Sequence, residues 1–216
     1  DNIRSVIGSV AVQQSIGNTL LVGVLSPTLC VLLGIVIAYA VRRLRVRGGG
    51  ILDYVAMFPI AVPGIVFGTG IFWTYLMTPA YGTIWILVIA FVASYIPFAY
   101  RMVDTSILQI DRSLEEASSV CGASHWRTAR QVTFRLIRPG VLSAWILVFI
   151  FSIREISAAI LLASPSNKVL SVMSWDYLEF GNVQNAAIIG LLQTAILVAG
   201  IVVGRYVLRV RLSQAV

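Results

Sequence analysis

The chain has 216 residues, of which 58% are hydrophobic and only 12% are charged, with a mean hydropathy of +0.90. Soluble domains carry about 25% charged residues, so this composition excludes them, along with disordered, collagen-like and disulfide-based folds. The net charge of +7 comes from arginines between apolar runs, without a long basic stripe bearing aromatics, which argues against nucleic-acid binding. We predict an all-α, polytopic membrane protein with no cofactor and no tightly bound metal.

Five apolar runs are long enough to cross a lipid bilayer, which takes about 20 residues at a rise of about 1.5 Å each. Lipid offers no partner to open backbone groups, so all five runs are predicted to be helices. The second run holds Pro59 and Pro63, so its helix is expected to be kinked or broken near the middle of the membrane. The predicted spans are residues 19–41, 51–76, 83–100, 140–162 and 186–207.

Three further segments flank these spans. Residues 1–18 are too polar to cross a membrane and are predicted to lie at its outer interface, and residues 209–216 form a short cytoplasmic tail. In the loop 163–185 apolar residues recur at helical spacing, which predicts a short helix at the outer interface. The first residue is Asp1 and no signal peptide follows, which favours a trimmed chain or a piece of a longer polypeptide.

The arginines predict the orientation. Thirteen of them fall in the first connection, the third connection and the C-terminal tail, whereas the opposite side holds only Arg4 and Lys168. Cytoplasmic loops carry the excess of basic residues, so we expect the N-terminus outside and the C-terminus in the cytoplasm. Asp53 and Asp104 then lie near cytoplasmic helix ends, where they are expected to be solvated or paired with arginines.

The connection 102–138 is far longer than two neighbouring spans require. Its Ser113-x-x-Glu116 pattern is typical of a capping box and predicts a helix from about residue 114, which Gly122 then interrupts. This helix–glycine–helix segment suits docking of a soluble partner, or equally a loop resting on lipid headgroups. The second short helix is expected to place Trp126, Ala129 and Val132 on one face, with Arg127 and Arg130 opposite.

This connection resembles the EAA loop of ABC-importer permeases, whose pattern is Glu-Ala-Ala-x3-Gly-x9-Ile-x-Leu-Pro. Ser118 stands in place of the second alanine, and Arg135 stands where the family usually has proline. The resemblance covers roughly residues 15–208. The residues that carry it are Glu116, Ala117, Ser118, Gly122, Val132 and Phe134.

The resemblance implies a type I permease domain over residues 19–208, in the bacterial inner membrane, that forms half of a translocation path. Its implied partners are a second permease domain, an extracytoplasmic binding protein and a cytoplasmic ABC ATPase dimer. The only lysine is Lys168 and no Walker A sequence surrounds it, so this chain is not expected to be an enzyme and ATP hydrolysis falls to another subunit. The implied ATPase-coupling residues are Glu116, Ala117, Ser118, Gly122, Trp126, Arg127, Val132 and Phe134.

The substrate is less sharply indicated than the class. Residues 154–162 and 169–172, with Trp175, are similar to ferric-iron permeases, which often carry two such domains in one polypeptide. Thiamine, aminoethylphosphonate and polyamine permeases are much alike here and remain alternatives. A secondary transporter or channel is the alternative class, although neither accounts for the EAA spacing.

Arg154 and Glu155 are predicted to lie in the middle of the fourth span, where a charge costs at least about 2.5–3.5 kcal/mol and should face the bundle or water. They either line a path or gate, or pair with a neighbouring helix or subunit. Pro63 and Gly64 are predicted to line the same path.

Overall fold

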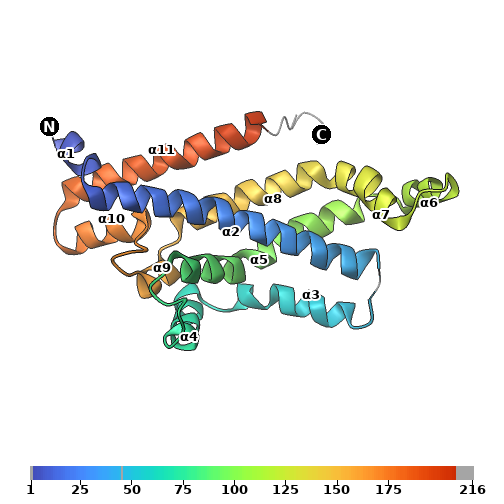
Figure 1. The fold of residues 1–216 in the computed structure, drawn as a ribbon, viewed down its shortest axis with the longest axis horizontal. Coiled ribbons are helices and arrows are strands. Elements are labelled where there is room, and N and C mark those ends of the chain that lie inside the picture. The colour runs from blue at the N-terminus through green and yellow to red at the C-terminus, as the bar shows by residue number, and fades with distance from the viewer. Residues whose placement is uncertain (1, 45, 208–216) are drawn as a thin grey trace.

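Three long helices form the centre of the molecule. The computed structural model describes residues 2–44 and 46–207. Within them α2 (Val10–Arg42), α5 (Ile84–Leu108) and α8 (Phe134–Arg154) run side by side along the long axis (Figure 1). The last helix, α11 (Val183–Val207), lies against the outside of this group. The described residues contain only helices and their connections, which confirms the all-α prediction.

Four helical stretches of the described chain are long and apolar enough to cross a membrane: 10–42, 84–108, 125–154 and 183–204. They correspond to the first, third, fourth and fifth predicted spans, and several extend well beyond the predicted bounds. The predicted tail 209–216 lies outside the described residues, as do Arg45, Arg209 and Arg211.

The second predicted span is broken, as its prolines led us to expect. It consists of α3 (Gly49–Met57), the short 3-10 helix η1 (Phe58–Ala61) and α4 (Gly64–Tyr75), and it bends by 108° between η1 and α4. Pro63 forces the preceding Val62 into an extended conformation, with φ −102° and ψ 125°. This pair supplies a fifth span if it crosses the membrane as one unit.

The predicted interfacial segment 1–18 is not one structural unit. It comprises α1 (Asn2–Ile7) and the first nine residues of α2, whose start is capped by Ser9. The polar side chains that suggested a separate segment bind backbone in the loop before α10. Asn18 donates to the carbonyl oxygens of Ser166 and Lys168, at 3.2 and 3.0 Å.

The predicted helix in the loop 163–185 is present as α10 (Leu170–Glu179). One face of it packs inside the protein, where Leu170 and Met173 join a buried cluster with Val12 of α2 and Ile189 of α11. Packing against these helices therefore orders one face of α10, while Trp175 and Leu178 stay exposed. The position of α10 at the outer interface stays a prediction.

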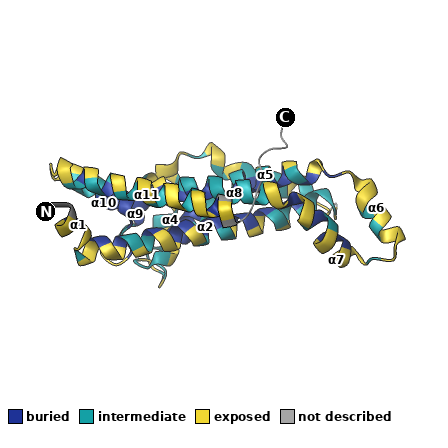
Figure 2. Ribbon diagram, turned by 90° about the horizontal axis from the view of Figure 1, so that it is seen from above, coloured by how far each residue is buried: buried dark blue, intermediate teal, exposed yellow. Residues whose placement is uncertain are grey.

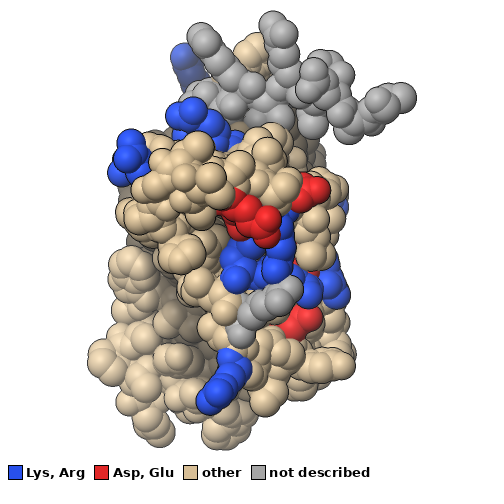
Figure 3. Space-filling view, turned by 90° about the vertical axis from the view of Figure 1, so that its right-hand side faces the viewer, with Lys and Arg blue, Asp and Glu red and all other residues tan. Residues whose placement is uncertain are grey.

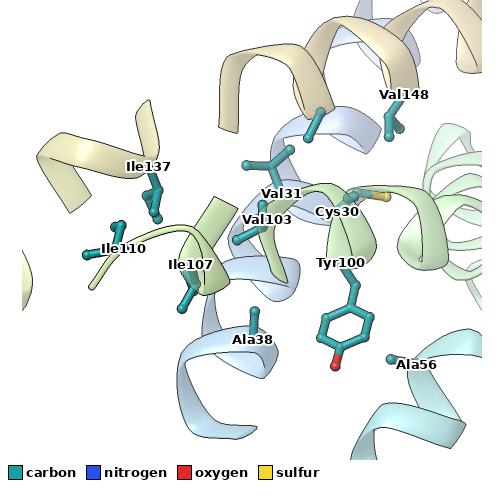
Figure 4. Packing of buried hydrophobic residues seen from close by; sticks show 12 residues of the cluster. Cys30, Val31, Ala38, Ala56, Tyr100, Val103, Ile107, Ile110, Ile137 and Val148 are labelled. Atoms are coloured by element: carbon teal, nitrogen blue, oxygen red, sulfur yellow. The ribbon is translucent and has the colours of Figure 1, made fainter. Parts of the chain in front are cut away.

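The main core lies between α2, α5 and α8, and buried residues line the inner faces of these helices (Figure 2). Tyr100 of α5 is fully buried and its ring points towards Ala56 of α3 (Figure 4). The outward faces of the same helices stay apolar and exposed, as at Leu32 and Val36 of α2. This pattern suits helices surrounded by lipid.

Basic and acidic side chains gather at one end of the bundle (Figure 3). Arg42 binds Asp104 through two hydrogen bonds, Nε to Oδ1 at 2.6 Å and Nη2 to Oδ2 at 2.8 Å. The Asp104 side chain is only 1% exposed, and Asp53 lies 3.9 Å from the same guanidinium. The prediction that these aspartates pair with arginines is confirmed.

Candidate functional site

The segment between α5 and α8 projects from the charged end of the bundle (Figures 1 and 2). It consists of α6 (Arg112–Val120), a tight turn, α7 (His125–Thr128) and the π-helical turn η2 (Ala129–Thr133). We call residues 111–133 the coupling segment, after the role that the resemblance to the EAA loop implies.

The first helix of the coupling segment begins earlier than predicted. Asp111 is its N-cap, and the Asp111 carboxylate accepts a hydrogen bond from the backbone N–H of Ser113 at 2.9 Å. This bond holds the pKa of Asp111 below its usual range. The predicted capping box is therefore wrong, and Glu116 lies within the helix with its side chain exposed.

The turn between α6 and α7 depends on Gly122. Its φ of +82° lies in the left-handed region that favours glycine, and its N–H donates to the carbonyl of Ser119 at 2.9 Å. Ser124 then caps α7, its Oγ accepting from the N–H of Arg127 at 3.4 Å. The sharp turn predicted at this glycine is confirmed.

The inner side of the coupling segment is attached to the bundle. Glu115 forms an ion pair with Arg43 at the end of α2, at 3.0 Å, and accepts a hydrogen bond from Thr133 at 2.6 Å. Arg43 also donates to the carbonyls of Ile107 and Ile110, where α5 ends. Sequence reasoning missed Glu115 and Arg43, because 72 positions separate them and no spacing rule connects them.

Ser118 links the two short helices. Its hydroxyl lies 3.0 Å from the Thr128 hydroxyl, within hydrogen-bond distance. The serine that replaces the second alanine of the EAA pattern thus holds α6 against α7.

The outer side of the coupling segment is exposed and partly apolar. Val120 is 88% exposed and Trp126 is 72% exposed. Ala129, three residues after Trp126, is buried, so the described chain covers only part of the predicted apolar face. Glu116, Ala117 and Arg127 are exposed on the same segment.

The predicted second short helix does not end before the fourth span. Residues 125–154 form one continuous helical stretch in which α7 passes through the π turn into α8. Arg135 keeps the backbone N–H that the family's usual proline lacks, which is compatible with an unbroken helix. Val132 is partly buried, and Phe134 stacks on Tyr39 of α2 with ring centroids 6.4 Å apart.

A second break lies at the other end of α8. The helix ends at Arg154, Glu155 is extended with ψ 125°, and α9 (Ser157–Leu162) follows. The prediction that Arg154 and Glu155 lie mid-helix is therefore wrong.

Polar side chains form hydrogen bonds with the backbone groups that lose their helical partners at this break. Gln193 of α11 donates to the carbonyl of Ile153 at 2.6 Å, and Ser171 of α10 donates to the carbonyl of Glu155 at 2.7 Å. The Glu155 carboxylate accepts from the hydroxyl of Tyr95 and from the N–H of Ala158. Glu155 is thus fully engaged within the protein.

The two broken helices meet. A Cβ added at Gly64 would lie 3.4 Å from Cβ of Ser157, and one at Gly68 would lie 2.9 Å from Cα of Ala158. The start of α4, directly after Pro63, therefore packs on α9. Of the four predicted path residues, Pro63 and Gly64 lie on this side of α9.

Arg154 lies elsewhere, in a cavity of about 500 Å³ between the end of α8, α10 and α11. Ser171 and Trp175 of α10 and Gln193 and Thr194 of α11 also line it. The adjacent residues Arg154 and Glu155 thus lie in different surroundings: Arg154 lines this cavity, whereas Glu155 is bound to Tyr95 and to the backbone of α9.

Comparison with known proteins assigns the family. The family model described as "Binding-protein-dependent transport system inner membrane component" matches residues 30–216. The chain belongs to this family. It is accordingly a multi-pass inner-membrane protein, in agreement with the resemblance stated from the coupling segment.

Two relatives of this inner-membrane component differ in their substrates. The ferric transport system permease protein FbpB of Actinobacillus pleuropneumoniae is 29% identical over 187 residues, which cover 86% of this chain and 27% of that protein. The permease protein PhnV of Salmonella typhimurium, assigned to 2-aminoethylphosphonate transport, is 28% identical over 180 residues, which cover 82% of this chain and 68% of that protein. The chain thus spans about a quarter of the length of the ferric relative.

The fold of this inner-membrane component is shared with solved transporters. A crystal structure of a bacterial ABC transporter involved in the import of the acidic polysaccharide alginate matches with a TM-score of 0.77 at 16% identity, over 99% of this chain and 84% of that one. The likeness at this identity concerns the fold.

Proposed function

We propose that the chain is the permease component of an ATP-driven importer and that it docks a cytoplasmic ABC ATPase through the coupling segment. The observation that carries this proposal is that the coupling segment, in a chain of this family, is attached to the bundle on one side and exposed on the other. Its inner side is attached through Glu115 and Arg43, while Glu116, Val120 and Trp126 are exposed. Exposed apolar and aromatic side chains beside charges are typical of a protein-docking surface.

The attachments give a route by which ATPase closure would reach the membrane helices. A push on α6 passes to α2 and α5 through the Arg43 side chain, which binds Glu115 and two carbonyls at the end of α5. A push on α7 passes into α8 along the unbroken stretch 125–154. The chain has no Walker A sequence, so ATP is hydrolysed by the docked subunit.

The proposed assembly is a pseudo-twofold pair of permease domains, with an extracytoplasmic binding protein on one side and an ATPase dimer on the other. In α11 only 11% of the apolar stretch is buried by the described chain. This leaves a large surface for lipid and for a second domain. Substrate would cross between the two domains.

For the substrate we propose ferric iron. The similarity of residues 154–162 to ferric permeases and the FbpB relative support it. The PhnV relative, of which this chain covers more, favours an aminoalkyl phosphonate as the second candidate.

Deleting the gene for this chain should abolish uptake of radiolabelled ferric iron and spare uptake of 2-aminoethylphosphonate, thiamine and putrescine. The chain is expected to form half of the path, so proteoliposomes that hold it without a second permease domain should stay inactive. Re-expressing the chain should restore iron uptake. If the deletion left iron uptake normal and abolished phosphonate uptake, the substrate would be a phosphonate instead of ferric iron, and the proposed importer class would still hold. Transport by the monomeric chain, without a second permease domain, would refute the proposed two-domain assembly.

We expect a reporter fused after Val216 to be active in the cytoplasm, and one fused before Arg4 to be active only outside it. The reason is the excess of arginines at the end of the bundle that carries the coupling segment. Paired alkaline phosphatase and green fluorescent protein fusions measure both sides. The opposite pattern would invert the topology and place the coupling segment out of reach of any ATPase.

A further inference from the structure

The cavity at the end of α8 holds a cation without a partner. Arg154 is exposed into it, and among the described residues no carboxylate forms an ion pair with Arg154. The neighbouring carboxylate of Glu155 is bound to Tyr95 and to the backbone of α9. The closest acid in sequence is thus engaged elsewhere.

The rest of the lining adds donors and no negative charge. Gln193 uses one of its two amide N–H groups on the carbonyl of Ile153, which leaves the other N–H. The indole N–H of Trp175 makes no hydrogen bond to the part of the chain that is described. Asp176, which follows Trp175, pairs with Lys168 at 2.6 Å. The remaining lining residues are hydroxyl-bearing, aliphatic or glycine.

We propose that this cavity binds an anionic group of the phosphate, phosphonate or carboxylate type, with Arg154 as its main contact. A planar guanidinium presents paired N–H donors that match two oxygens of such a group. Arg154 is the last residue of a helical stretch long and apolar enough to cross a membrane, where a charge is expected to have a counter-charge, and the described chain supplies none. A volume of about 500 Å³ is ample for a headgroup or a small solute.

The ligand could come from a lipid headgroup or from solution, and the two sources share this chemistry. The proposal does not depend on the ferric substrate proposed above. The same charge disfavours a bare metal cation or a polyamine in this cavity. Binding of putrescine here as tight as binding of phosphate would contradict it.

The test uses the full protein in nanodiscs of phosphatidylcholine. Inorganic phosphate, 2-aminoethylphosphonate and putrescine are titrated while tryptophan fluorescence is recorded, and native mass spectrometry counts phosphatidylglycerol retained from mixed nanodiscs. The variants are Arg154→Gln and Arg154→Lys. Arg138→Gln is the matched control, because it removes an exposed arginine of the same helix outside the cavity.

We expect Arg154→Gln to weaken anion binding at least tenfold, Arg154→Lys to weaken it less, and Arg138→Gln to behave as the parent. Binding of a soluble anion identifies the source as a solute, and retention of phosphatidylglycerol alone identifies it as a lipid. No anion binding by the parent, or equal binding by Arg154→Gln, would overturn the proposal.

Discussion

Gly122→Asp is expected to reduce substrate uptake at least tenfold while the protein still inserts and accumulates normally. An L-residue at a φ of +82° costs about 1 kcal/mol or more, so the turn between α6 and α7 would shift. The new carboxylate would also stand on the surface proposed to face the ATPase. Apart from its own residue and the two neighbours in the chain, no heavy atom lies within 4 Å of the added Cβ, so the bundle itself should be unaffected.

Gly48→Asp is the matched control for this variant. Gly48 has a φ of +85°, is exposed, and also has open space around an added Cβ, but it lies in the α2–α3 connection. Uptake and ATPase co-purification should be measured side by side for both variants. Loss in Gly122→Asp with near-parental values in Gly48→Asp supports coupling through this segment. Parental uptake by Gly122→Asp would make the segment a passive connector.

Glu116→Gln extends the same comparison without backbone strain. Because Glu116 is exposed and caps no helix end, its loss should leave thermal stability unchanged. A smaller loss of uptake and of ATPase capture than in Gly122→Asp is expected.

Asp104→Asn should produce the largest loss of stability. Its carboxylate is 1% exposed and receives two hydrogen bonds from Arg42, so the change leaves a partly buried guanidinium with only Asp53, 3.9 Å away, as a counter-charge. Removing one partner of such a pair costs on the order of 3 kcal/mol. The thermal midpoint of the detergent-solubilised protein is the measurement.

Asp176→Asn is the control, because Lys168 and Asp176 are also 2.6 Å apart but 34% and 30% exposed. Neither side chain of this pair is buried as deeply as Asp104, and ion pairs in contact with water contribute about 0–1 kcal/mol, so its midpoint should move much less. The double variant Arg42→Met/Asp104→Leu should recover part of the loss, since both members of the close pair are removed. The two charges that lose a contact, Asp53 and Arg101, have side chains that are 31% and 55% exposed. Equal midpoints for the two single variants would show that burial of Asp104 has little energetic weight.

The helices and one of the two helix breaks could be predicted from the local sequence alone. Long apolar runs can be stable in lipid only as helices, and the two prolines four residues apart, Pro59 and Pro63, favour a break. A single proline does not suffice, since α2, α5 and α8 continue through Pro27, Pro97 and Pro139. The turn at Gly122 was also predictable, since it depends on a single residue's backbone preference. These features arise within a few residues of chain.

The break at Glu155 was not predictable in this way. Neither proline nor glycine stands there, and the open backbone is satisfied by Ser171 and Gln193 from helices far along the chain. The first residue of α6 could not be predicted from local sequence either, since Asp111 and Ser113 are both good N-caps. The choice of Asp111 coincides with the pairing of Glu115 with Arg43, a contact between distant segments.

The continuous helical stretch 125–154 joins Trp126 in the coupling segment to Arg154 at the end of α8. Thirty helical residues extend about 45 Å, so a tilt of about 5° at one end would displace the other by about 4 Å. The helix can thus act as a lever arm, with the π turn of η2 near its base. A partner bound at Trp126 that tilts this helix would therefore displace the wall of the Arg154 cavity directly, because no loop lies between the two residues.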